Sequence, residues 1–196
     1  SYAPNAIDPE IYYDKKGKMW MTYGSWSGGI FTIEIDPSTG KAKYPGKTYT
    51  RDDGLLVDQY FGTRIAGGKA NSGEGPFVVY DEKTDYFYLY MSYNFLDSVS
   101  GYNMRLFRSK NPDGPFVDAA GNNANMFVSS DKSHEDVGIK VMGTYKFSCL
   151  DKYYKSEGHN SAMIDDDGQM YLFYHTRFSD SGEYHELRVH QQFQNE

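Results

Sequence analysis

The 196-residue sequence predicts an all-β protein that forms part of a β-propeller, and this chain supplies about three blades. Two observations carry the prediction. One sequence pattern recurs three times, and each copy has two apolar runs around a turn rich in Asp, Lys and Gly. The chain is also rich in aromatic residues, with 19 Tyr and 12 Phe. Aromatic side chains fit the pleated surface of a sheet, so they favour β structure.

The repeated pattern is defined by an aspartate, a tyrosine nine residues later, and a polar leader six or seven residues before the aspartate. The pairs are Asp14 and Tyr23, Asp81 and Tyr90, and Asp165 and Tyr174. The leaders are Asp8, Glu74 and His159. A hydroxyl residue also follows each tyrosine by two positions: Ser25, Ser92 and Thr176.

Each copy predicts a β-hairpin followed by a third strand, because turn residues separate two short apolar runs. The first unit covers about residues 5–50, with strands within 8–14 and 19–23 and a third over 29–35. The second covers about 72–118, with strands within 74–81 and 86–91 and a third that contains Met104 and Leu106. The third covers about 157–196, with strands within 159–165 and 170–174 and a third that contains Leu187 and Val189.

The strand over 86–91 is apolar on both faces. Phe87 and Leu89 point to one side, while Tyr88 and Tyr90 point to the other. Strands of this kind lie between two other layers, and small sheets repeated radially form a β-propeller. The alternative is a meander or sandwich with accidental internal similarity. In a propeller, the polar leaders open the innermost strands, so they converge on the central channel.

A propeller usually needs four to eight blades, whereas only three units are recognisable here. We therefore expect the chain to be the central part of a single propeller domain in a larger protein, which is truncated, cleaved or completed by a second chain. Two long linkers, 37–73 and 111–158, are expected to be functional or mobile loops. Within the second linker, residues 118–133 are the segment most expected to be disordered.

Composition excludes several classes of function. The net charge is −7 and the 20 Lys and Arg form no basic stripe, which argues against a nucleic-acid partner. No apolar run approaches the roughly 20 residues of a membrane-spanning helix. The single cysteine, Cys149, excludes an intrachain disulfide and a cysteine-based zinc site.

Two of the leaders, Asp8 and Glu74, are carboxylates. Two carboxylates that converge on a channel are expected to raise each other's pKa by repulsion and desolvation. A carboxylic acid that stays protonated can donate a proton to a leaving group, as glycoside hydrolysis requires. The alternative is that both residues only accept hydrogen bonds from backbone amides at the start of a strand.

Three more residues are candidates for ligand binding. His159 is either a channel ligand for a metal ion or an ordered water, or a buried histidine without such a role. Trp26 lies at the end of a predicted strand, where it could stack on a sugar or pack at the rim. Asn5 could hydrogen-bond a hydroxylated ligand or cap a turn.

Several spaced motifs resemble glycoside hydrolase family 43, most closely its endo-α-1,5-L-arabinanases, over essentially the whole chain. The motifs are Asn5-Ala6-Ile7-Asp8-Pro9, Gly24-Ser25-Trp26-Ser27-Gly28, Ser72-Gly73-Glu74-Gly75-Pro76, Gly158-His159-Asn160-Ser161-Ala162, Tyr174-His175-Thr176-Arg177 and 185–191. Their number and order make the resemblance specific.

The resemblance implies a five-bladed propeller that hydrolyses α-1,5-linked arabinan with inversion. Glu74 matches the general acid, and Asp8 matches the carboxylate that tunes and holds it. His159 matches the histidine beside a channel ion, which is calcium in many members. The segments that match the arabinan-binding groove contain Asn5, Ala6, Ile7, Ser25, Trp26 and Ser27.

The same resemblance implies that the general base lies in a first blade outside this chain, so we expect the isolated chain to be inactive. Two alternatives stay open: a sugar-binding propeller without catalysis, and an exo-acting arabinofuranosidase or xylosidase of the same family. The expected partners are arabinan or its oligosaccharides and the missing blades, and not a membrane. An enzyme that degrades a polymer outside the cell has to reach that polymer, so we expect this protein to be secreted. The absence of disulfides is compatible with a bacterial source.

Overall fold

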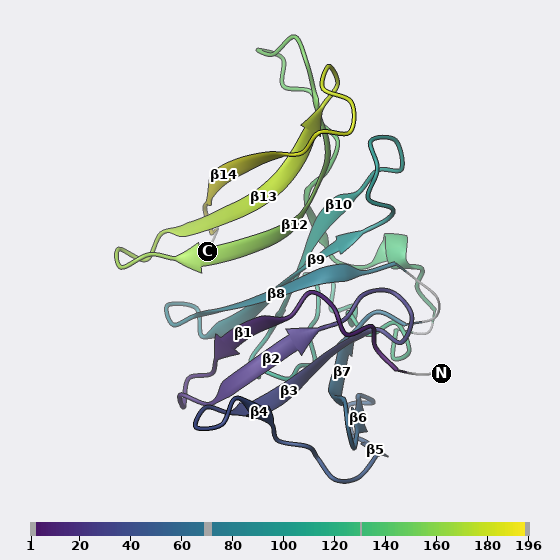
Figure 1. The fold of residues 1–196 in the computed structure, drawn as a ribbon, viewed down its shortest axis with the longest axis vertical. Coiled ribbons are helices and arrows are strands. Elements are labelled where there is room, and N and C mark those ends of the chain that lie inside the picture. Colours follow the sequence, from purple (N-terminus) through teal and green to yellow (C-terminus); the bar gives the residue numbers. More distant parts are fainter. Residues whose placement is uncertain (1–2, 69–71, 130, 195–196) are drawn as a thin grey trace.

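The computed structural model describes residues 3–68, 72–129 and 131–194 and has three antiparallel β-sheets (Figure 1). The first sheet contains β1 (Glu10–Tyr13), β2 (Met19–Tyr23), β3 (Ile30–Asp36), β4 (Lys41–Ala42), β5 (Tyr49–Thr50), β6 (Leu56–Asp58) and β7 (Gly62–Ala66). The second contains β8 (Glu74–Asp81), β9 (Tyr86–Tyr93), β10 (Asn103–Ser109) and β11 (Ile139–Met142). The third contains β12 (Tyr154–Ile164), β13 (Met170–Phe178) and β14 (Glu186–Gln192).

The all-β prediction is confirmed over the described residues, whose only helical element is a 3-10 turn at His134–Asp136. None of the described helices is long and apolar enough to cross a membrane. The three predicted hairpins are also confirmed, since β1 pairs with β2, β8 with β9, and β12 with β13, each antiparallel. The predicted third strands are β3, β10 and β14, which pair with the second strand of each hairpin.

The recurring aspartate organises the turn of each hairpin. Its carboxylate accepts hydrogen bonds from backbone N–H groups two and, in two units, four residues later, as Asx-type turns do. The distances run from 2.7 to 3.1 Å, from Lys16 and Lys18 to Asp14, from Lys83 to Asp81, and from Asp167 and Gln169 to Asp165. The nine-residue spacing between aspartate and tyrosine therefore has a structural cause in the hairpin.

The linkers contain more regular structure than predicted. The first linker contains β4 to β7, from Lys41 to Ala66, which extend the first sheet to seven strands because β7 pairs with β3. Leu55 and Ile65 are fully buried there. These strands are two to five residues long, which is too short for alternation to show in the sequence.

Residues 118–133 are ordered, so the prediction of disorder is wrong for the described part of that segment; Ser130 lies outside it. Ala124, Asn125 and Met126 are fully buried. The Asp118 carboxylate accepts N–H bonds from the backbone at both ends of its loop, including Gly138 at 2.9 Å. Hydrogen bonds to Asp and Asn side chains order this loop, where a sheet would use hydrogen bonds between strands. Composition alone does not show these bonds, so a segment rich in Asp and Asn was expected to be disordered.

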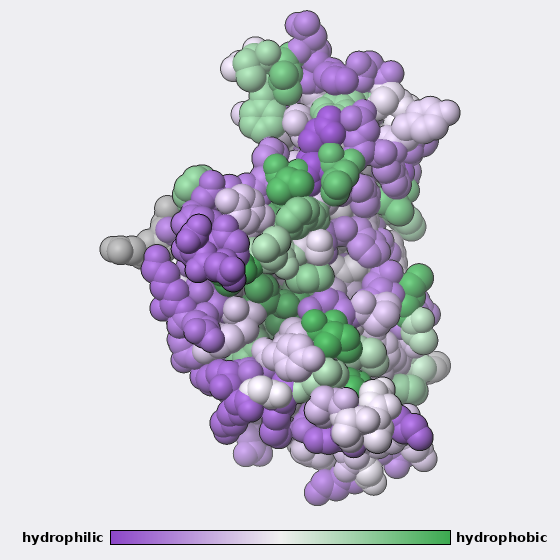
Figure 2. Space-filling view, turned by 60° about the vertical axis from the view of Figure 1, so that its left-hand side comes forward, coloured by the Kyte–Doolittle hydropathy of each residue, from purple (hydrophilic) through white to green (hydrophobic). Residues whose placement is uncertain are grey.

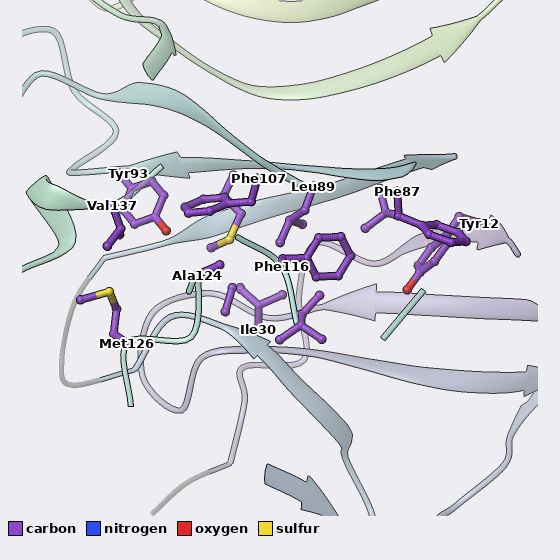
Figure 3. Close-up of a cluster of buried hydrophobic side chains, with 14 residues drawn as sticks. Tyr12, Ile30, Phe87, Leu89, Tyr93, Phe107, Phe116, Ala124, Met126 and Val137 are labelled. Atoms are coloured by element: carbon purple, nitrogen blue, oxygen red, sulfur yellow. The ribbon is translucent and has the colours of Figure 1, made fainter. Parts of the chain in front are cut away.

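The main hydrophobic cluster fills the space between the first and second sheets (Figure 3). From β9 it takes Phe87, Leu89 and Met91, while Tyr90 on the opposite face belongs to the cluster between the second and third sheets. This confirms that β9 is buried on both faces. Each sheet thus packs face to face on the next, as propeller blades do.

The first strands of the three sheets lie side by side. The Val78 N–H on β8 donates to the Glu10 carboxylate on β1 at 3.2 Å, and the His159 N–H on β12 donates to Ser92 Oγ on β9 at 2.6 Å. Figure 2 shows hydrophobic side chains gathered along the middle of one face, flanked by hydrophilic ones. These innermost strands bring the polar leaders together.

Candidate active site

The three leaders meet at one end of the innermost strands. The backbone N–H of Gly75, directly after Glu74, donates to Asp8 Oδ2 at 3.3 Å. The other oxygen of Asp8 lies 3.7 Å from Nε2 of His159. The predicted convergence of Asp8, Glu74 and His159 is therefore confirmed.

Glycines on both sides of Glu74 make this approach possible. Gly73 and Gly75 have φ angles of 151° and 55°, in a region that favours glycine. A Cβ atom on Gly75 would lie 3.1 Å from Cγ of His159, so a larger residue would require the His159 ring to shift. The Gly73 carbonyl accepts the N–H of Trp26 at 2.9 Å, which ties this strand start to the first sheet.

Three side chains donate hydrogen bonds to the carboxylate of Glu74. The Tyr102 hydroxyl donates to Oε1 at 2.6 Å. The Ser25 hydroxyl and the Trp26 indole N–H donate to Oε2 at 3.2 and 3.0 Å. Both oxygens are thus engaged, which fixes the plane of the carboxylate.

The turn that carries Ser25 and Trp26 is braced by Asn5. The Asn5 amide donates to the Ser25 carbonyl at 2.6 Å and to Ser27 Oγ at 3.4 Å. Trp26 and Ser27 both have positive φ angles, 48° and 43°, so the turn holds a conformation that non-glycine residues rarely adopt. The structure therefore brings Asn5 and residues 25–27 together with Glu74.

Ala6 and Ile7 lie apart from this carboxylate. They line a different pocket of about 310 Å³, whose walls include Tyr23, Tyr44 and Tyr60 but not Glu74. Their backbone still contributes, because the Ile7 carbonyl accepts the Gly24 N–H at 3.0 Å. The geometry gives these two side chains no contact with the cluster around Glu74.

Sequence reasoning missed several residues of this site. Tyr102 is one of 19 Tyr and occupies none of the positions that recur in the three units. Phe95 packs on Trp26 with ring centroids 5.0 Å apart and is 63% exposed. The recurring hydroxyls were a usable signal: Ser25 donates to Glu74, and Ser92 accepts the His159 N–H at 2.6 Å.

Asp8 and His159 also border an open pocket of about 420 Å³ along the innermost strands, whose walls include Glu10, Asn160 and His175. Burial raises the pKa of Glu10 to about 8, against the lowering effect of the Val78 hydrogen bond. Burial, with the nearby His185, lowers the pKa of His175 to about 4, so its imidazole is neutral at pH 7.

A calcium ion stays a prediction. Calcium takes six to eight oxygen ligands, and the described part of the chain has no group of three or more His, Cys, Asp or Glu that could hold a metal. His159 supplies one imidazole, and its nearest carboxylate is Asp8. These side chains do not form a calcium cage, so no chemical step is assigned to an ion.

A sequence profile of the glycosyl hydrolases family 43 matches residues 2–192. An extracellular endo-α-(1→5)-L-arabinanase 2 of Bacillus subtilis is 45% identical, over 98% of this chain and 40% of the relative. An extracellular endo-α-(1→5)-L-arabinanase of Thermotoga petrophila is 42% identical, with the same coverage. An extracellular exo-α-(1→5)-L-arabinofuranosidase of Cellvibrio japonicus is 29% identical, over 87% of this chain and 44% of the relative.

Solved structures of family 43 enzymes are also similar to this chain. The endo-1,5-α-L-arabinanase of Thermotoga petrophila superposes with a TM-score of 0.80 at 41% identity, over 97% of this chain and 41% of that structure. A family 43 glycoside hydrolase of Bacillus licheniformis superposes with a TM-score of 0.83 at 43% identity, over 96% of this chain and 41% of that structure. The chain thus spans about 40% of the length of the two curated endo-arabinanases from Bacillus subtilis and Thermotoga petrophila.

Proposed function

This chain belongs to the glycosyl hydrolases family 43, and we propose that the complete protein hydrolyses α-1,5-linked L-arabinan with inversion. The observation that carries the proposal is the carboxylate of Glu74, which accepts three side-chain hydrogen bonds. The next residue, Gly75, donates its N–H to Asp8, and both Gly75 and Asp8 border an open pocket. A carboxyl group fixed in this way suits proton transfer to a glycosidic oxygen.

In the proposed mechanism, Glu74 gives its proton to the leaving oxygen as the glycosidic bond breaks. Asp8 holds the backbone at Gly75 and adds a negative charge beside the acid. Inversion also needs a base that activates water, roughly 6.5–9.5 Å from the acid. We propose that this base lies in a part of the complete protein outside these 196 residues. The remaining blades of a five-bladed propeller belong to the same part.

Endo action is the proposed mode. Two relatives named as endo-acting are 45% and 42% identical, whereas a relative named as exo-acting is 29% identical. The exposed ring of Phe95 packs on the half-buried Trp26, whose indole N–H donates to Glu74, and aromatic faces of this kind bind sugar rings. An exo-acting enzyme is the second candidate, because the Cellvibrio relative is named as exo-acting.

The protein is also proposed to be secreted by a bacterium. The relatives from Bacillus and Thermotoga are named extracellular enzymes. An insoluble or very long polysaccharide is broken down outside the cell, which agrees with that location.

The test is hydrolysis of linear α-1,5-arabinan by the complete protein, with β-1,4-xylan as the control polymer. We expect the viscosity of the arabinan solution to fall well before most linkages are cut, and the xylan to stay intact. Release of monomeric arabinose without an early fall in viscosity would replace endo with exo action. Binding without any cleavage would instead favour a sugar-binding propeller.

A further inference from the structure

We propose that Tyr102 is a positioning residue that fixes Glu74 and stabilises its carboxylate after proton transfer. Because Glu74 acts as an acid only under the proposed function, this role rests on that proposal. No repeat or motif singles out Tyr102, which directly precedes β10.

The first observation is the contact itself. The Tyr102 side chain is fully buried, and its hydroxyl donates to Glu74 Oε1 at 2.6 Å. The two other side-chain donors, Ser25 and Trp26, both reach Oε2. Among the described side chains, Tyr102 is thus the donor that fixes Oε1. Loss of its hydroxyl leaves that oxygen without this partner and lets the carboxylate rotate.

The second observation is that the third sheet fixes the ring of Tyr102. The ring stacks on the imidazole of His175, with centroids 5.8 Å apart and planes 11° from parallel. On another side it packs against Gly158, where an added Cβ would lie 2.4 Å from Tyr102 Cε1. Since neither partner needs the hydroxyl, phenylalanine fits the same space.

The third observation concerns charge. Burial, followed by the negative charge of Glu74, raises the pKa of Tyr102 well above its ordinary value, so the phenol stays protonated and donates. The other titratable groups that face this site are Asp8 before β1, His159 on β12, and His175 and His185 at β13 and β14. His175 is neutral at pH 7 because burial lowers its pKa to about 4. Tyr102 is therefore a neutral donor in a buried position, where a hydrogen bond to a carboxylate is strong.

The test is Tyr102→Phe in the complete protein, assayed on linear arabinan across pH. Hydrogen bonds to charged groups support a fall in kcat of about 10- to 100-fold, with KM changed less than about twofold. Without the donor the carboxylate left after proton transfer loses a hydrogen bond, so the alkaline limb of the kcat/KM profile should move to higher pH. A merely structural role would lower stability without moving that limb.

Tyr93→Phe is the matched control. Tyr93 is also fully buried, and its hydroxyl has no hydrogen-bond partner among the described residues, so this variant should keep the wild-type profile. If Tyr102→Phe behaves like Tyr93→Phe, the role of Tyr102 is overturned while arabinan hydrolysis by the wild type still stands.

A second measurement does not depend on activity. In denaturant unfolding of the complete protein, the effects of Tyr102→Phe and Glu74→Ala should be non-additive, because the two groups are in direct contact. Additive effects would overturn the contact. Absence of hydrolysis by the wild type, together with a clear coupling, would reject the proposed function alone.

Discussion

Replacing Glu74 by glutamine in the complete protein is expected to lower kcat on arabinan about 10³-fold, within the range that general acid catalysis contributes. Glutamine has nearly the same shape, and its amide oxygen can still accept one of the present hydrogen bonds. It has no proton to give to the leaving oxygen, however. Binding of arabino-oligosaccharides should therefore change by only a few-fold, and the loss should appear in kcat.

A substrate that needs no acid separates this role from a structural one. An aryl arabinoside with a good leaving group departs without protonation, so the Glu74→Gln variant should retain much more activity on it than on arabinan. Glu82→Gln, on an exposed glutamate in the turn after β8, is the control. Turnover of arabinan at the wild-type rate by Glu74→Gln would rule out Glu74 as the acid.

The second large effect is expected at Glu10, where glutamine should make the protein more stable at high pH. Burial raises the pKa of Glu10 from 4.5 to about 8. Between these values the folded state binds a proton that the unfolded state has lost, so stability falls as the pH rises. A shift of this size corresponds to at most about 5 kcal/mol above pH 8. Below pH 4.5 the contribution is fully present and the two proteins should be alike.

The measurement is the midpoint of thermal unfolding from pH 4 to pH 9 for the complete protein and for Glu10→Gln. The wild type should lose stability relative to the variant over this range, and the two curves should converge at the acidic end. Glu82→Gln again serves as the control, since its side chain is exposed. Parallel curves for the wild type and Glu10→Gln would contradict a buried, proton-binding Glu10.

Local signals in the sequence were enough to predict the hairpins and the meeting of Asp8, Glu74 and His159. A turn such as that at Asp165 is determined by its own few residues. The repeat then places each polar leader at the same position relative to its hairpin, and stacking the repeats brings the leaders together. The spacing of the repeat in the sequence therefore predicts which residues lie close together in the fold.

Contacts between distant segments could not be predicted in this way. Tyr102 reaches Glu74 across 28 positions, and no spacing rule connects the two. The strands of residues 37–73 depend on pairing with β3, and the ordered loop that begins at Asp118 depends on a hydrogen bond from Gly138. Each of these features follows from tertiary packing, which a composition or periodicity argument does not contain.

The most direct test of the account is the configuration of the first product, followed by ¹H NMR while the complete protein cleaves an α-1,5-linked arabino-oligosaccharide. Inversion with Glu74 as the acid predicts that the β-anomer of the new reducing end appears first and then mutarotates. Early appearance of the α-anomer would show a retaining mechanism and would contradict the roles given to Glu74 and Asp8.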